Sequence, residues 1–244
     1  MRRVAAKLMH SLAAAVGNKV GKEAEELCAS GQCAAAAVAL KRAVDLGHLP
    51  SRALMAHMLT EGREGVAKDW NAAFELVEEG ARLDCHHCQG VMAWCYLDCM
   101  GCVRDVARSL ELARESSGKG SRYGQFVLGG LYLWGVGGVA RDIAQAVALY
   151  RLAASQNLDG AQDALGHMYD QGLGFIVDED DAEALRFFHL AAAQGHPWAL
   201  LNVALFHEHG RGDRKNKAAA IRWYRRAQAA GNPQAASALQ RLRA

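Results

Sequence analysis

The sequence predicts an all-α fold, a right-handed superhelix (solenoid) of about six helix–loop–helix repeats with capping helices. The first observation behind this prediction is composition. Alanine makes up about a fifth of the 244 residues, whereas the chain contains one threonine, Thr60, and three isoleucines. Because alanine favours helices and β-branched residues favour strands, a β-sheet is not expected. The second observation is a pattern that recurs every 36 to 38 residues, a spacing typical of stacked helix pairs.

The recurring pattern has a small residue, a large residue three positions later, a glycine, a short loop, an acid and an alanine-rich segment. Two copies span Leu128–Gly135 and Leu165–Gly172. The loop positions are spaced by 36, 37, 38 and 36 residues and are occupied by Asp69, Asp105, Asp142, Asp180 and Asn216. Fifteen positions after each comes a chain-reversing or polar residue: Asp84, Gly120, Asn157, Gly195 and Gly231. The register therefore holds through five units, and a shortened sixth unit begins near Lys22 with a loop at residues 30–32.

Small residues, glycines and prolines define the predicted helices of each unit. Small side chains let the first helix approach its partner closely, at Ala56, Ala93, Gly129, Gly166 and Ala204. Prolines suited to a first helical turn follow the glycines that end second helices, at Pro50, Pro197 and Pro233. One helix pair cannot bury its apolar face alone, so the units must stack. We expect an N-terminal helical cap or targeting segment at 1–21, the repeat array at 22–231 and a C-terminal capping helix at 232–244.

These units resemble Sel1-like repeats, relatives of the tetratricopeptide repeat with a glycine-containing loop between their helices. The likeness covers roughly residues 22–231 and is strongest in 121–157 and 165–195. The resemblance implies a non-catalytic adaptor or scaffold whose concave face is lined by the first helix of each pair. It implies a protein or peptide partner and no cofactor, and it assigns no catalytic residue.

The concave face is predicted from positions that vary between units while the packing positions stay fixed. These positions lie on the first helices, beside the small residue and one turn later. The predicted protein-binding residues are His57, Glu61, Trp94, Asp98, Trp134, His167, Gln171 and His209. Trp94 and Trp134 are the expected anchors, because tryptophan is common at the energetic centres of interfaces. Each could instead cover the next helix pair, which is the structural alternative.

Other chemistries find little support in the sequence. Five of the seven cysteines fall in one unit, but Cys88 and Cys99 are eleven residues apart on one helix, roughly 16 Å, too far to share a zinc ion. We predict reduced thiols and no metal, with a local site formed by Cys85, Cys88 and His86 or His87 as the alternative. No nucleophile motif supports an enzyme.

Charge and targeting signals are weak. The net charge of +2 does not by itself point to nucleic acid, although the C-terminal segment from Arg211 is basic, so nucleic acid is not an expected partner. No apolar run is long enough for a membrane span. The predicted location is cytoplasmic, with a mitochondrion or another organelle as the alternative if residues 1–21 act as a transit segment. A structural subunit of a larger complex is the alternative function.

Overall fold

The structure, a computed structural model, describes residues 2–173 and 176–243. The described residues form helices and no named strand. The helices are α1 (Arg2–Ala29), α2 (Cys33–Asp45), α3 (Leu49–Glu61), α4 (Trp70–Arg82), α5 (His86–Asp98), α6 (Val106–Gly118), α7 (Arg122–Trp134), α8 (Ile143–Ser155), α9 (Asp159–Gln171), α10 (Asp181–Ala193), α11 (Pro197–His209), α12 (Lys217–Ala229) and α13 (Ala235–Arg243). Consecutive helices pack in pairs from α1–α2 to α11–α12, and α13 packs on α12. The predicted all-α superhelix is confirmed.

In each of the last five units, the second helix begins directly after the loop residue that recurs every 36 to 38 positions. Each of these residues is an N-cap whose side chain accepts a hydrogen bond from a backbone N–H in the first turn. The N-caps are Asp69, Asp105, Asp142, Asp180 and Asn216. The repeat spacing is therefore set by a capping interaction that involves residues only three positions apart.

The second helices end where the sequence predicts a reversal of the chain. The backbone has positive φ at Asp84 (58°), Gly120 (84°), Asn157 (61°), Gly195 (81°) and Gly231 (84°). Glycine adopts this left-handed conformation without a steric penalty, and aspartate and asparagine tolerate it better than other side chains. The predicted unit boundaries are thus confirmed at all five positions.

Small and large residues compensate for each other inside the units. A Cβ atom on Gly129 would lie 3.1 Å from the ring of Tyr150, and one on Gly166 would lie 2.5 Å from the ring of Phe188. The missing side chains therefore make room for these two buried rings. Two of the units with alanine at the small position have a smaller residue, Val77 or Ala113, in place of the ring. The last unit has alanine and a ring together, and there the hydroxyl group of Tyr224 donates a hydrogen bond to Glu208.

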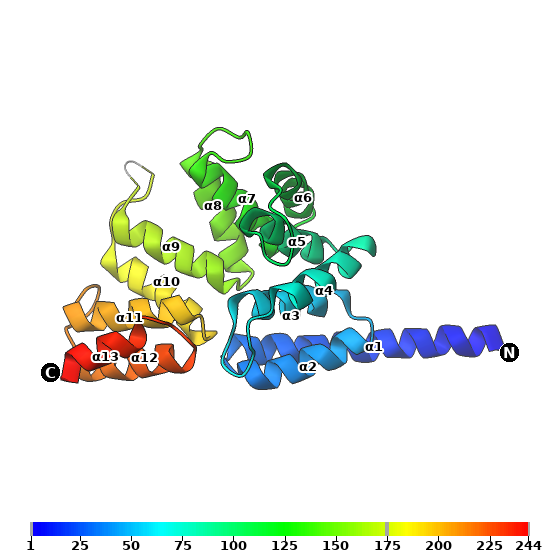
Figure 1. The fold of residues 1–244 in the computed structure, drawn as a ribbon, viewed down its shortest axis with the longest axis horizontal. Helices are drawn as coiled ribbons and strands as arrows, with labels where there is room; N and C mark the ends of the chain where they lie inside the picture. Colours follow the sequence, from blue (N-terminus) through cyan, green and yellow to red (C-terminus); the bar gives the residue numbers. More distant parts are fainter. Residues whose placement is uncertain (1, 174–175, 244) are drawn as a thin grey trace.

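The superhelix curves so strongly that its first and later units touch. Figure 1 shows the array rising from α1 and α2 through α5–α8 and returning to α11–α13. The loop between α1 and α2 lies close to the end of α10, because a Cβ atom on Gly31 would meet the carbonyl oxygen of Ala193. Cys33 at the start of α2 also contacts the carbonyl oxygen of Gln194 at 3.8 Å. These contacts between the first and fifth units limit which side chains on the concave side of the superhelix stay accessible to solvent.

The ends of the array differ in their relation to the predicted boundaries. Helix α1 continues without a break through residue 21, so the predicted border between the N-terminal segment and the array does not coincide with a helix end. At the other end, Ala235 and Leu239 of α13 are buried in the core of the last unit. None of the helices in the described ranges combines the length and apolarity needed to cross a bilayer.

Candidate binding site on the concave face

A groove of about 660 Å³ runs along the first helices of successive units. Helices α3, α5, α7, α9 and α11 contribute to its walls, and the turn after α12 borders it. The aromatic side chains that line it are Trp70, Trp94, Phe126 and Trp198. Trp70 and Trp198 are 44% and 42% exposed, which is unusual for side chains of this size. We call this space, with its aromatic and acidic lining, the inner groove.

Carboxylates occupy the inner groove beside the aromatic rings. Asp98 accepts a hydrogen bond from the indole N–H of Trp94 at 2.7 Å. Asp163 accepts one from the side-chain amide of Asn202 at 3.2 Å. Glu61 lies 3.6 Å from Nε2 of His196, the residue that caps α11. Lys68 is the lysine that lines this groove, and its ammonium group lies 5.5 Å from the centre of the Trp70 ring.

The structure brings four of the eight predicted binding residues together. Glu61, Trp94, Asp98 and His167 all line the inner groove. Three others are exposed but lie outside its lining: Trp134, Gln171 and His209. Trp134 is 72% exposed at the end of α7. Whether any of these residues binds a partner stays a prediction.

His57 does not face solvent, and the expectation that it does was wrong. Its side chain is 4% exposed. Nε2 of His57 lies 3.0 Å from Oδ1 of Asp159, whose side chain is also buried, at the start of α9. The curvature of the superhelix brings Asp159, at the start of α9, to His57 on α3, and the rings of Trp94 and Tyr123 also lie against His57.

Phe126, Asp163 and Trp198 also line the inner groove but were not predicted from the sequence. These residues precede the small residue of their helix by three or six positions, whereas the predicted stripe used only the positions one and five after it. Positions separated by three or four residues share one helical face, so the stripe continues toward the start of each first helix. Extending the predicted face by two turns would have included all three.

Next to the groove, a buried ionic cluster joins the second helix pair to α9. Arg63, in the loop after α3, forms an ion pair with Oδ2 of Asp159, and both side chains are nearly inaccessible. The ring of His57 is 5.6 Å from that of Trp94 and 5.5 Å from that of Tyr123. We call Arg63, His57 and Asp159 the closure cluster, because it ties together residues about 100 positions apart in the sequence.

The closure cluster keeps Asp159 ionised. Burial by itself would raise the pKa of Asp159, but the charge of Arg63 and the hydrogen bond from His57 outweigh it and hold this pKa well below its usual value. The ionic pair is therefore a structural element. It leaves neither Arg63 nor Asp159 available as a proton donor or acceptor near neutral pH.

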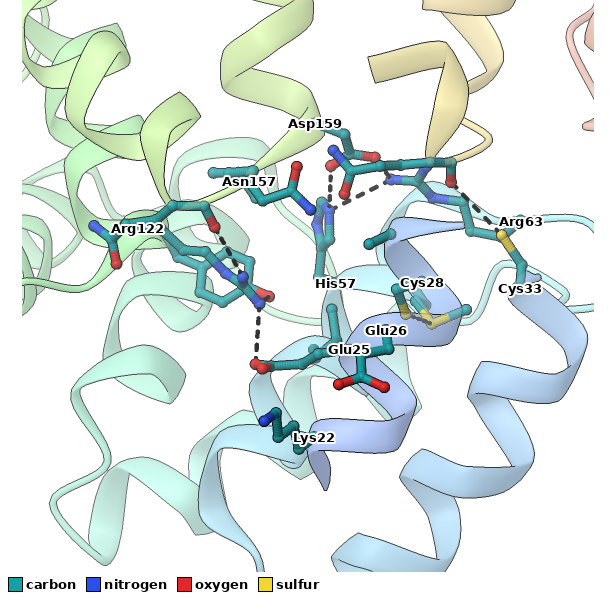
Figure 2. A pocket seen from close by; sticks show the side chains of 17 residues that line it. Lys22, Glu25, Glu26, Cys28, Cys33, His57, Arg63, Arg122, Asn157 and Asp159 are labelled. Atoms are coloured by element: carbon teal, nitrogen blue, oxygen red, sulfur yellow. Dashed lines mark hydrogen bonds and ion pairs between the residues drawn. The ribbon is translucent and has the colours of Figure 1, made fainter. Parts of the chain in front are cut away.

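A second cavity, of about 310 Å³, is lined by His57, Arg63 and Asp159 (Figure 2). Its lining includes Cys28, Leu54 and Met58, together with Glu25 on α1 and Arg122 on α7. The guanidinium of Arg122 donates to the carbonyl oxygen of Gln156 at 3.1 Å and lies 3.8 Å from Glu25. All three residues of the closure cluster line this second cavity and none lines the inner groove, although the ring of His57 lies 5.6 Å from that of Trp94 in the groove.

The cysteine-rich unit has the geometry of a packed helix. Cys85 and Cys99 cap the two ends of α5, and Cys88 and Cys95 are buried in the core. His87, one of the alternative metal ligands, has its Nδ1 atom 3.2 Å from the hydroxyl oxygen of Ser121. Among the described residues, no cluster of three or more His, Cys, Asp and Glu side chains is arranged to hold a metal ion.

We expect all seven cysteines to react with a thiol reagent after denaturation without reductant, because each is a free thiol in the structure. In the native protein, exposed Cys99 should react first. Cys95 should react slowly, because burial raises its pKa to about 12. The neighbouring Cys88 thiol holds the pKa of Cys85 below its ordinary value, but burial restricts access to Cys85. Mass spectrometry of alkylated protein over time measures this order, and fewer than seven labels after denaturation would reveal a disulfide.

Comparison with known proteins agrees with the geometry. The Sel1 repeat family profile matches residues 50–85, 122–158, 160–196 and 199–232. No curated protein sequence matches the chain. Among solved structures, a protective antigen of uropathogenic Escherichia coli with an SLR fold is 26% identical, with a TM-score of 0.57 over 85% of this chain and 44% of that one. The chain thus spans less than half of the E. coli protein.

Two further structures share the fold. A Sel1 repeat protein from Oxalobacter formigenes is 24% identical, with a TM-score of 0.60 over 91% of this chain and 89% of that one. A Sel1 repeat protein from Klebsiella pneumoniae is 20% identical, with a TM-score of 0.53 over 84% and 98%. The profile matches cover more than half of the sequence, and the helix pairs, caps and turns recur at the matched positions. The chain belongs to the Sel1 repeat family.

Proposed function

We propose that this chain is a non-catalytic scaffold that binds a peptide segment of a partner protein in the inner groove. Sel1 repeat proteins are generally protein-interaction scaffolds, and their fold is typically non-catalytic. The observation that carries the proposal is the grouping of three partly accessible tryptophans, Trp70, Trp94 and Trp198, in one concave space. Aromatic side chains in such positions often contribute most of the binding energy of an interface.

The shape of the inner groove favours a segment over a broad surface. It is bordered by five first helices and by residues 230–233, so an extended chain can contact several units at once. None of the three closure-cluster residues lines the groove, and their side chains are already paired with one another. A ligand in the groove would therefore contact the tryptophans and carboxylates and leave the cluster undisturbed.

We expect Trp198→Ala to weaken peptide binding by about thirtyfold or more, the loss typical of an interface hot spot. The probes are peptides selected against the wild-type chain from a displayed library of random dodecamers, with dissociation constants measured by fluorescence anisotropy. Trp134→Ala is the matched control. It removes an equally large and more exposed indole from outside the groove, and binding should change less than about twofold.

The proposal fails if no peptide is selected, or if the selected peptides bind Trp198→Ala as tightly as wild type. Circular dichroism must show the same thermal midpoint for both variants, so that a loss of binding is not a loss of folding. The alternative role as a structural subunit and the cytoplasmic or organellar location stay predictions.

A further inference from the structure

We propose that the segment bound in the inner groove carries a lysine or arginine side chain, held between the accessible tryptophans and the carboxylates of Glu61, Asp98 and Asp163. This inference rests on the proposed function and specifies the chemistry of the partner. The observations behind it are the charge of the groove, the hydrogen-bond partners of its carboxylates and the position of Lys68 over the Trp70 ring.

The inner groove is negatively charged. Three carboxylates line it, on α3, α5 and α9, against the single ammonium group of Lys68. Its formal charge is therefore −2 when the lining histidines, His167 and His196, are neutral. Arg63 lies nearby but is paired with Asp159, so it does not offset the three acids. A chain with a net charge of +2 thus concentrates negative charge on the face proposed to bind.

The groove carboxylates have no lysine or arginine partner within the described residues. Asp98 is bonded to the neutral indole of Trp94, and Asp163 to the neutral amide of Asn202. The nearest basic groups to Glu61 and Asp163 are histidines, at 3.6 to 3.9 Å.

Several acids elsewhere on the surface differ in this respect, because each pairs with an arginine or lysine. They are Glu78, Glu79, Glu111, Glu115 and Glu183. The three groove carboxylates have no such partner in the described structure, so an incoming cation could pair with them.

The aromatic rings add a second attraction for a cation. The face of an indole ring is electron-rich and attracts ammonium and guanidinium groups. The structure already contains one example in this groove, because Lys68 lies over the ring of Trp70. Trp198 is 42% exposed, and among the described residues no cation or aromatic ring stacks on it. A ligand side chain placed over Trp198 would repeat the arrangement of Lys68 and Trp70.

The same charges disfavour other ligands. An acidic segment or a nucleic-acid phosphate would meet three carboxylates at close range and lose affinity through like-charge repulsion. Among the described residues, no lysine or arginine from Arg211 onward lines the inner groove. Arg211 pairs with Asp170 and Asp181, and Arg241 pairs with Glu208. The inner groove is therefore selective for positive charge.

The test uses the selected dodecamers described above and a double variant, Glu61→Gln with Asp98→Asn. These changes remove two charges but keep size, and the asparagine oxygen can still accept from Trp94. The matched control is Glu78→Gln with Glu111→Gln, which removes the same charge from the second helices α4 and α6. We expect the selected peptides to share a lysine or arginine, and the groove variant to bind them about tenfold more weakly while the control stays within about twofold.

A variant of the peptide completes a double-mutant cycle with the groove variant. Replacing the shared arginine with citrulline, or the lysine with norleucine, should cost about tenfold with wild type and little with the groove variant. If the selected peptides depend on Trp198 but share no basic residue, or bind the groove variant as tightly as wild type, this inference is wrong and the proposed function stands. If no selected peptide depends on Trp198, both are wrong.

Discussion

Asp159→Asn should lower the free energy of unfolding by about 3 kcal/mol, because it leaves the charge of Arg63 buried without a counter-ion. The two side chains are 3% and 6% exposed, so water cannot replace the lost partner. Urea denaturation followed by far-UV circular dichroism measures the change. The closure cluster joins the second unit to the fifth, so its loss should also loosen contacts between distant parts of the array.

Two control variants separate this effect from a general loss of charge. Glu183→Gln removes the partner of Arg186 in an exposed ion pair and should cost less than about 1 kcal/mol. Replacing the buried pair together, with Arg63→Met and Asp159→Leu, should recover part of the loss, since it removes both buried charges. A loss for Asp159→Asn no larger than that for Glu183→Gln would show that the cluster does not stabilise the fold.

The same pair has a defined pH dependence. The pKa of Asp159 is held well below its usual value in the folded state, so its contribution to stability is complete above the unfolded pKa of about 4. This contribution is lost as the pH falls through the lower folded pKa. The difference in stability between wild type and Asp159→Asn should therefore be constant from neutral pH to about pH 5 and narrow below about pH 4.

Phe188→Ala should destabilise the protein by about 3–5 kcal/mol, because it empties a fully buried ring position. Gly166→Ala should cost about 1–3 kcal/mol for the opposite reason, since the added methyl group would lie 2.5 Å from the Phe188 ring. Both losses are measured by urea denaturation. As a control, Gly118→Ala has no atom within 4 Å of the added methyl group and should not destabilise the chain.

The two positions should also be coupled. The unit built on Ala56 carries Val77 where the unit built on Gly166 carries Phe188. We therefore expect Gly166→Ala combined with Phe188→Val to cost less than the sum of the two single changes. Additivity within about 0.5 kcal/mol would contradict the small–large compensation that the packing indicates.

The helix pairs could be predicted because their signals are local. An N-cap such as Asp142 acts on a backbone N–H three residues away, and a reversal at Asn157 depends on the conformational preference of that residue. Such interactions are independent of the rest of the chain, and they recur in each unit. The spacing of the units, their ends and the family therefore follow from the sequence.

The inner groove could be predicted only in part. Glu61, Trp94, Asp98 and His167 were identified because they vary at fixed positions of a helical face. Trp198 lies on the same face but two turns earlier, and nothing local distinguishes it from an exposed residue at a helix start. Its place in the groove depends on where α11 comes to lie relative to α3 and α5.

The sequence by itself determined the repeating unit and the positions of its caps and turns, and it identified part of the inner groove. Only the tertiary structure decided how tightly the units curl, and hence that Arg63 and His57 meet Asp159 and are withdrawn from solvent. The reason is physical: each unit is fixed by contacts within a few residues, whereas curvature accumulates small rotations from one unit to the next. Residues about 100 positions apart therefore meet through a sum of packing geometries that no single segment encodes.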